Sequence, residues 1–298
     1  KAFPEAYRFF PLISESMLIK SLLLMSAHNK IKPFESYVFS LIDRCDPKQV
    51  VRQMDWVLAS GRKKEKNKFI EMLRPVYKRL LPCIRIETLG RFNIFCRHQV
   101  LDSKVFEGVK PVLLLKSIVL HGSTDIPKEI LIDDLWPRAT AKAGDKNFKI
   151  NLHRLRKAIE PDPKKEFGYS YIIQKAGLIS LDPELVTLDS DEFITFSARA
   201  VENEKKLLFE TALEWYEKAV DIYKGDYFAE EPYMEWISRK RDLFKTRFFE
   251  LLQKKAMLHE EKDQIDNAVK TWNLILSFDP CFEEAYQNLM ILYADSGQ

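Results

Sequence analysis

The residues best suited to bind another molecule lie on one face of a helix that the sequence predicts over residues 145–159. At 100° per residue, Phe148, Leu152, Leu155 and Ile159 share one side and should face a core. The opposite side carries Lys146, Asn147, Lys149, Ile150, His153, Arg154 and Lys157, with no acidic residue among them. Cations neutralise phosphates, and Arg154 or Asn147 could reach base edges, so this face predicts binding in the major groove of double-stranded DNA.

A solvated basic surface is the alternative for this helix taken alone, and the neighbouring segments favour the DNA interpretation. Helical spacing also occurs over residues 112–119 and 130–136, and strand patterns occur over residues 171–173 and 178–180. Three helices followed by a hairpin are typical of a winged helix. Lys175 near the hairpin tip could contact a phosphate or the minor groove, although a solubilising lysine fits equally well.

The segments in front of the winged helix have a different pattern. Residues 84–88 and 92–96 alternate between apolar and polar positions around Gly90, which predicts a small antiparallel sheet over residues 84–101. Residues 1–82 show helical spacing, as in Tyr7–Met25 and Phe34–Ile42, and look like the end of an α-solenoid. The predicted fold is therefore mainly α with a small β component.

Residues 191–298 predict helical repeats. The 34-residue tetratricopeptide pattern has small residues at its eighth and twentieth positions, an aromatic at the twenty-fourth and proline at the thirty-second. A frame that starts at Phe249 supplies Ala256, Ala268, Trp272 and Pro280. A frame that starts at Phe193 supplies Ala200, Ala212, Tyr216 and Ala219, with Lys224 in place of the proline. A further frame from Glu283 supplies Tyr286, Leu289 and Tyr293. We expect an α-solenoid here.

The charge of the 298-residue chain is unevenly distributed. The net charge of +3 divides into +8 for residues 1–83, +3 for residues 84–190 and −8 for residues 191–298, where 14 basic residues face 22 acidic ones. An acidic block does not bind a polyanion, so DNA contacts should come from the first two blocks, and the third should bind protein.

Other classes of function find little support in the sequence. A P-loop, a Gly-x-Ser-x-Gly elbow and a His-Glu-x-x-His helix are absent, so we expect no catalytic site and no enzyme. The 4 cysteines and 5 histidines are widely spaced, which predicts no metal site, no cofactor and reduced thiols in the cytoplasm. The apolar run Leu12–Met25 is too short and polar for a membrane span. Because Lys1 rather than methionine begins the sequence, we expect a piece of a longer chain.

Residues 113–137, 146–162 and 168–182 resemble the OmpR-like winged helix of bacterial activators of the antibiotic-regulatory-protein type. The segment that follows resembles the bacterial transcriptional activator domain of the same proteins. Its matching residues are Asp191–Phe193, Ala212–Val220, Tyr223–Asp226, Trp236, Arg241 and Asp279–Met290. The resemblance covers about residues 84–298 and implies sequence-directed DNA binding, activation of transcription, and helical repeats used for dimer or partner contacts. Residues 1–82 depart from the simplest members, which begin at the sheet.

The segment Pro137–Gly144 is predicted to be a loop of about eight residues between the second and third helices of the winged helix. In OmpR-like folds the loop at this place approaches RNA polymerase, which gives a role to Arg138 and Lys142. An exposed loop without a function is the alternative.

The sequence therefore predicts three parts: a helical segment over 1–82, a winged-helix DNA-binding domain over 83–190 and a tetratricopeptide-like activator domain over 191–298. We expect a transcriptional regulator that binds double-stranded DNA, contacts RNA polymerase and forms a homodimer at least on DNA. The alternatives are a protein-interaction scaffold whose winged helix binds no DNA, and the output part of a larger ATPase-linked regulator.

Overall fold

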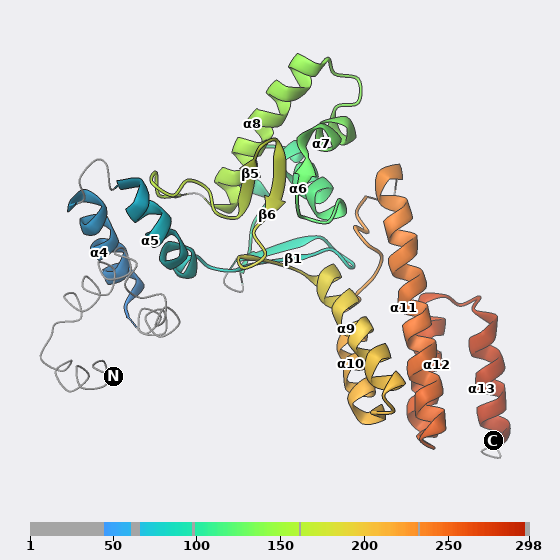
Figure 1. Cartoon of the computed structure of the whole chain (residues 1–298). Coiled ribbons are helices and arrows are strands. Elements are labelled where there is room, and N and C mark those ends of the chain that lie inside the picture. Colours follow the sequence, from blue (N-terminus) through green and yellow to red (C-terminus); the bar gives the residue numbers. More distant parts are fainter. Residues whose placement is uncertain (1–44, 61–65, 97–98, 161, 232, 296–298) are drawn as a thin grey trace, which may run out of the picture.

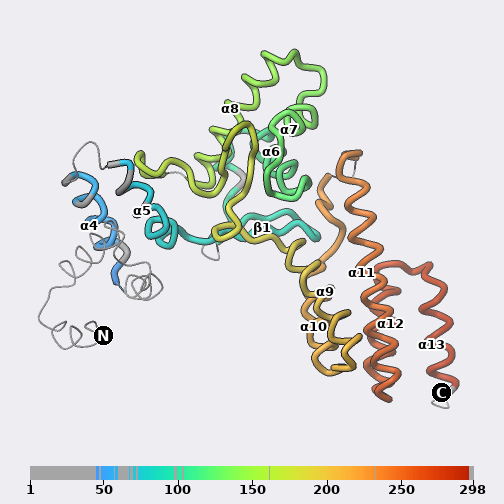
Figure 2. Tube along the Cα trace, viewed as in Figure 1, coloured from blue at the N-terminus to red at the C-terminus, as the bar shows by residue number. Residues whose placement is uncertain are grey.

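The computed structural model describes residues 45–60, 66–96, 99–160, 162–231 and 233–295. The fold is mainly α with a small β component, as predicted. The helices expected over Tyr7–Met25 and Phe34–Ile42 lie outside the described residues. Figure 1 shows α4 and α5 on one side of the β-strands and α9 to α13 on the other. The α-carbon trace in Figure 2 follows the same arrangement.

The first described helices are α4 (Pro47–Ser60) and α5 (Lys66–Leu80). They contact each other through apolar side chains. Of these, Val50, Met54, Leu73 and Val76 are fully buried. The pair also contacts the middle of the chain. The ring of Tyr77 stacks on Phe167 at 4.6 Å, and Nζ of Lys78 lies 2.7 Å from a carboxylate oxygen of Asp182.

A four-stranded sheet follows, in the order β3-β2-β1-β7. Strands β1 (Ile84–Glu87), β2 (Asn93–Cys96) and β3 (Gln99–Val100) are antiparallel, which confirms the sheet predicted here. Strand β7 (Val186–Leu188) pairs with β1 in parallel and was not predicted. A strand of 3 residues is too short for a periodicity argument, and its partner lies about a hundred residues earlier in the chain.

The central helices are α6 (Val109–Leu120), α7 (Lys128–Leu135) and α8 (Ala141–Ile159), preceded by the short 3-10 helix Ser103–Val105. A second sheet packs beside them in the order β4-β6-β5, with β4 (Ile126–Pro127), β5 (Ile172–Lys175) and β6 (Leu178–Leu181). Ala176 and Gly177 both have positive φ, as a two-residue hairpin turn that matches the strand twist requires. Three helices followed by this hairpin have the order of a winged helix.

Helix α8 begins four residues earlier than predicted, so the loop expected over Pro137–Gly144 is wrong in its second half. Thr140 caps the helix, because its hydroxyl accepts from the N–H of Ala143 and its carbonyl accepts from the N–H of Gly144 at 2.8 Å. Gly144 is a packing residue here, since a Cβ at this position would lie 2.7 Å from Cγ2 of Ile132. Glycine lets α8 approach α7 closely instead of ending the helix.

Helices α9 (Asp189–Lys205), α10 (Phe209–Ile222), α11 (Glu235–Glu261), α12 (Ile265–Phe278) and α13 (Glu283–Asp295) complete the described chain. The small and aromatic positions of the first two frames are fully buried: Ala200, Ala212, Tyr216, Ala219, Ala256, Ala268 and Trp272. The helix pairs α9–α10 and α11–α12 each contain an equivalent hydrogen bond. Tyr216 donates to Glu204 in the first pair, and Nε1 of Trp272 donates to Glu260 at 2.7 Å in the second. These features confirm the repeat pattern.

The third frame differs from the expected repeat. Leu289 is buried, but Tyr286 and Tyr293 are 48% and 39% exposed. In a repeat array these aromatics fill the gap to the next helix, and no later helix covers them within the described part of the chain. The face of α13 that carries them is therefore open to solvent.

The central part and the C-terminal helices contact each other through buried and partly buried polar groups, at what we call the junction. Asp189 at the start of α9 is 2% exposed and accepts hydrogen bonds from the N–H and hydroxyl of Thr88. Nζ of Lys116 on α6 lies 2.9 Å from Glu231. Lys240 on α11 donates to the carbonyl of Leu120 at 2.8 Å and so caps the C-terminus of α6. The domain boundary expected at residue 190 falls inside the first turn of α9.

None of the described helices combines the length and the apolar character that a membrane crossing requires.

Candidate nucleic-acid interface

Helix α8 carries the candidate site on the side opposite its core contacts. Phe148, Leu152, Leu155 and Ile159 are buried, which confirms the predicted core face. The opposite side exposes Lys146, Lys149, Ile150, His153, Arg154 and Lys157, and Asn147 is half-buried. In Figure 1 the N-terminal half of α8 extends away from the C-terminal helices. The structure thus gathers the seven predicted residues of this helix on one solvent-facing surface.

Two hydrogen bonds from a single side chain tie α8 to the second sheet. Nε and Nη2 of Arg156 donate to the carbonyl of Ile172 at 3.1 and 2.8 Å and thereby tie the helix to β5. Burial lowers the pKa of this guanidinium without removing its charge, because the ordinary pKa of arginine is far above neutral pH. Nδ2 of Asn151 donates to the carbonyl of Asn147 within the helix. Periodicity did not single out Arg156, since its partner lies on another element.

The first turns of α8 are anchored by Asp145. Its carboxylate oxygens lie 2.8 Å from Nζ of Lys128 on α7 and 2.7 Å from Nζ of Lys149. These two ammonium groups hold the pKa of Asp145 at about 2, well below its usual value. Lys149 therefore shares its charge between this carboxylate and solvent, and it is less free to neutralise a phosphate than Lys146.

A carboxylate that the helix pattern did not reveal lies on the same surface. Glu107, just before α6, places its oxygens 3.4 Å from Nε of Arg154 and 3.3 Å from Nζ of Lys157. All three side chains are at least 43% exposed, so water screens these ion pairs. The seven residues of the basic face include no acid, but Asp145 of α8 and Glu107 of a distant segment both pair with its cations.

The remaining predicted residues lie around this surface. Ile150 is 41% exposed between the cations, and an apolar side chain there suits a thymine methyl group. The ring of His153 lies edge-on to Tyr169 at 6.4 Å. Lys175 is exposed at the end of β5, on the hairpin and separate from α8. Arg138 is exposed in the connection between α7 and α8, whereas Lys142 lies in the first turn of α8 and not in a loop.

A basic cleft beside the hairpin β5–β6 is a further candidate site, and the sequence pattern did not indicate it. Arg74 and Lys78 from α5 line it together with Arg156, Tyr169 and Gln174. Lys78 is held by Asp182 and Glu184, each at 2.7 Å, so two acids already neutralise part of this charge. The cleft exists only because α5 packs beside the hairpin, and no spacing within one segment signals it.

Chemistry other than binding has little support at these surfaces. Among the described residues, no group of three or more histidine, cysteine or carboxylate side chains is arranged to hold a metal ion. The groups that converge on α8 are cations, one imidazole and two ion-paired carboxylates, which suit recognition of an anionic polymer better than proton transfer.

Comparisons with known proteins give the class of the C-terminal helices and a fold for a larger part of the chain. Residues 188–298 match the family model of the bacterial transcriptional activator domain, which supports a transcriptional regulator as the class of protein. The fold is similar to that of Mycobacterium tuberculosis EmbR in complex with a low affinity phosphopeptide, with a TM-score of 0.60 and 14% sequence identity. The likeness covers 71% of this chain and 55% of that chain, so this chain spans about half the length of its structural relative. No curated protein matches the sequence.

Proposed function

We propose that this chain is a sequence-specific DNA-binding regulator of transcription, and that α8 enters the major groove. The observation that carries the proposal is the exposed face of α8, where four cations and an amide stand opposite a fully formed apolar core face. A helix held this way presents its polar groups as a rigid set, which base recognition requires. The activator-domain match to residues 188–298 supports the same class of function.

The roles of the individual residues follow from their chemistry and place. Arg154 and Asn147 are assigned to base edges, because guanidinium and amide groups make paired hydrogen bonds to guanine and adenine. Lys146, Lys149 and Lys157 are assigned to phosphates. His153 and Ile150 complete the surface that faces the groove, and Lys175 on the hairpin contacts the backbone or minor groove beside it.

The division into 1–82, 83–190 and 191–298, the homodimer on DNA and the contact with RNA polymerase belong to the same proposal. The C-terminal block carries a charge of −8, which disfavours DNA and favours protein partners. Arg138 and Lys142 remain the candidates for polymerase, as an exposed pair that spans the α7–α8 connection and the first turn of α8.

The proposal is tested by measuring DNA affinity as a function of salt. Lys146, Lys149 and Lys157 together neutralise about three phosphates, and Arg154 adds a fourth on random DNA, where it reads no base. The logarithm of the association constant should therefore fall with log salt at a slope of roughly −3 to −4 per bound α8. Arg154→Ala should cost about 1–3 kcal/mol and more on the specific operator than on random DNA. Lys270→Ala, an exposed lysine on α12, is the matched control and should change nothing.

One observation favours a second function, a protein-interaction scaffold that binds no DNA. Glu107 forms ion pairs with Arg154 and Lys157, which shows that a protein carboxylate can bind these cations in place of a phosphate. The same titration separates the two functions, because a scaffold would show neither affinity for random DNA at low salt nor sensitivity to Arg154→Ala.

A further inference from the structure

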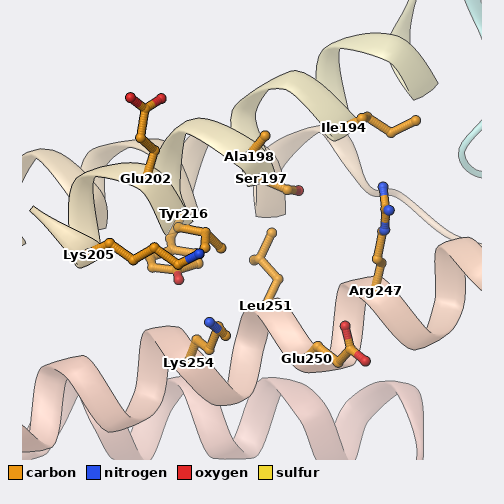
Figure 3. A pocket seen from close by; sticks show the side chains of 11 residues that line it. Ile194, Ser197, Ala198, Glu202, Lys205, Tyr216, Arg247, Glu250, Leu251 and Lys254 are labelled. Carbon is orange, nitrogen blue, oxygen red and sulfur yellow. The ribbon is translucent and has the colours of Figure 1, made fainter.

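A groove runs between α9 and α11, the first helices of the two successive pairs in the C-terminal block (Figure 3). Its volume is about 490 Å³, within the range of sites that hold a small ligand or a few peptide residues. The groove lies in the activator domain and involves none of the residues of α8. A ligand in this groove therefore leaves α8 uncovered.

The floor of the groove is apolar. Ala198 and Val201 from α9, Leu251 from α11 and the buried ring of Tyr216 supply it. The polar groups of the floor are already used, since Tyr216 donates to Glu204 and the hydroxyl of Ser197 donates to the carbonyl of Phe193 at 2.6 Å. A ligand therefore gains contact here through aliphatic groups.

The ends of the groove are cationic. Figure 3 shows Lys205 and Lys254 at one end, on opposite helices, and Arg247 at the other. Lys254 lies 3.7 Å from Glu204, whereas Lys205 and Arg247 have no ion-pair partner among the residues that the structure describes. A cluster of cations is unusual in this part of the chain, because residues 191–298 carry a net charge of −8.

Two acids also line the groove and limit what it can bind. Glu202 points away from α11 in Figure 3 and is held by Lys206 at 2.6 Å. Glu250 stays on the rim next to Arg247. A ligand with positive groups would meet Lys205 and Lys254 at one end, so the charge distribution selects an anionic ligand with an apolar middle.

The spacing of the cations indicates an extended chain. Arg247 and Lys254 are two helical turns apart on α11, about 10 Å at 1.5 Å per residue. An extended peptide rises about 3.3 Å per residue and turns every second side chain to the same face. Acidic residues at positions i and i+4, with an aliphatic residue at i+2, would span about 13 Å and place all three side chains toward the groove.

We propose that this groove binds an extended acidic peptide segment of a partner protein, with an aliphatic side chain on the floor and a carboxylate at each end. Lys205 and Lys254 receive one carboxylate, and Arg247 receives the other. The activator domain thus recruits its partner through a short linear motif, independently of DNA.

The test uses the whole chain and a fluorescent, end-capped peptide of seven residues, with leucine at its centre, glutamate two positions to either side and serine elsewhere. Fluorescence anisotropy should show saturable binding that weakens as salt increases. Replacing both glutamates by lysine, or leucine by serine, should weaken it at least tenfold. Equal binding of the glutamate and lysine peptides would overturn the proposal.

Variants of the protein locate the binding. Lys205→Glu and Arg247→Glu should each weaken the glutamate peptide at least fivefold, and Ala198→Trp should fill the floor and abolish binding. Lys270→Glu on α12 is the control, because it makes the same charge reversal outside the groove. Thermal unfolding of each variant establishes that it is folded. Affinity that Lys205→Glu and Arg247→Glu leave unchanged would also overturn the proposal, whatever the outcome of DNA titrations.

Discussion

Glu107 is paired with two of the cations on the exposed face of α8, which we propose to bind DNA. Its carboxylate faces Arg154 and Lys157, so a phosphate that approaches either cation must displace it or share them with it. Glu107 would weaken a complex in which Arg154 and Lys157 contact only phosphates, because its carboxylate repels them. It would weaken less a complex in which Arg154 contacts a base instead. In the proposed complex, Glu107 would therefore favour specific over random DNA.

Replacing Glu107 should therefore raise affinity for random DNA. We expect Glu107→Gln to strengthen binding to a random duplex about two- to tenfold at low salt, with a smaller gain on the operator. The substitution removes one negative charge from the protein surface that faces the phosphates. Anisotropy titrations at two salt concentrations measure both effects. Glu261→Gln, an exposed acid at the end of α11, serves as control. An unchanged or weaker affinity for random DNA would contradict this role.

Single residues also show what the sequence could predict. Phe148, Leu152, Leu155 and Ile159 were predicted as core because one helix contains its own periodicity. Glu107 and Arg156 were not, because each acts on a residue of another element, and such contacts depend on how the chain packs. Periodicity reveals the face of a helix but not what another segment places on it.

At the scale of elements, the two faces of α8 should separate stability from binding. Leu152 is 3% exposed, so Leu152→Ala should lower the free energy of unfolding by about 2–5 kcal/mol through lost burial and a cavity. Lys157→Ala should leave the melting temperature nearly unchanged and weaken DNA binding. Denaturant unfolding and anisotropy measure the two properties. If both variants lost stability equally, the assignment of the faces would be wrong.

The ion pairs of Asp145 should make the anchoring of α8 to α7 dependent on pH. The pKa of Asp145 is lowered to about 2, so its contribution to stability is complete above its unfolded value near 3.8 and is lost as pH falls toward about 2. Asp145→Asn should be less stable than the parent protein at pH 7, and the difference should shrink below about pH 4. Denaturant unfolding at several pH values measures this difference. Asp133→Asn, an exposed acid on α7, is the control, and a difference independent of pH would argue against the ion pairs.

Element boundaries were predicted well where local rules decide them and poorly where packing does. The hairpin β5–β6 was foreseen from the strand patterns over residues 171–173 and 178–180. Gly144 was taken as part of a loop because the segment Pro137–Gly144 has no large apolar side chain to bury, but its packing against Ile132 keeps it inside α8. Strand β7 was missed because its only signal is the parallel partner β1. The C-terminal repeats were found because buried small residues recur at fixed spacing.

At the scale of the whole molecule, the connection between α7 and α8 lies far from α12 and α13 in Figure 1. A surface there could face polymerase while the C-terminal helices bind another partner. Replacing Arg138 and Lys142 together by alanine should abolish activation in a reconstituted transcription assay and spare most operator binding. Full activation by this double variant would exclude the contact. A loss of activation in proportion to DNA binding would assign the two residues to DNA instead.

The junction between the central part and the activator domain has a consequence for the layout of operators. Asp189 and Lys240 join the two parts through a buried and a partly buried hydrogen bond, which oppose rotation of the activator domain relative to the central helices. In a dimer held together by the C-terminal helices, the two copies of α8 would then keep one fixed rotational phase about the DNA axis. Lengthening the operator spacer by about 5 base pairs would turn one half-site to the far side of the duplex, whereas about 10 would restore its direction. The proposed dimer would therefore respond to helical phase as well as to base sequence.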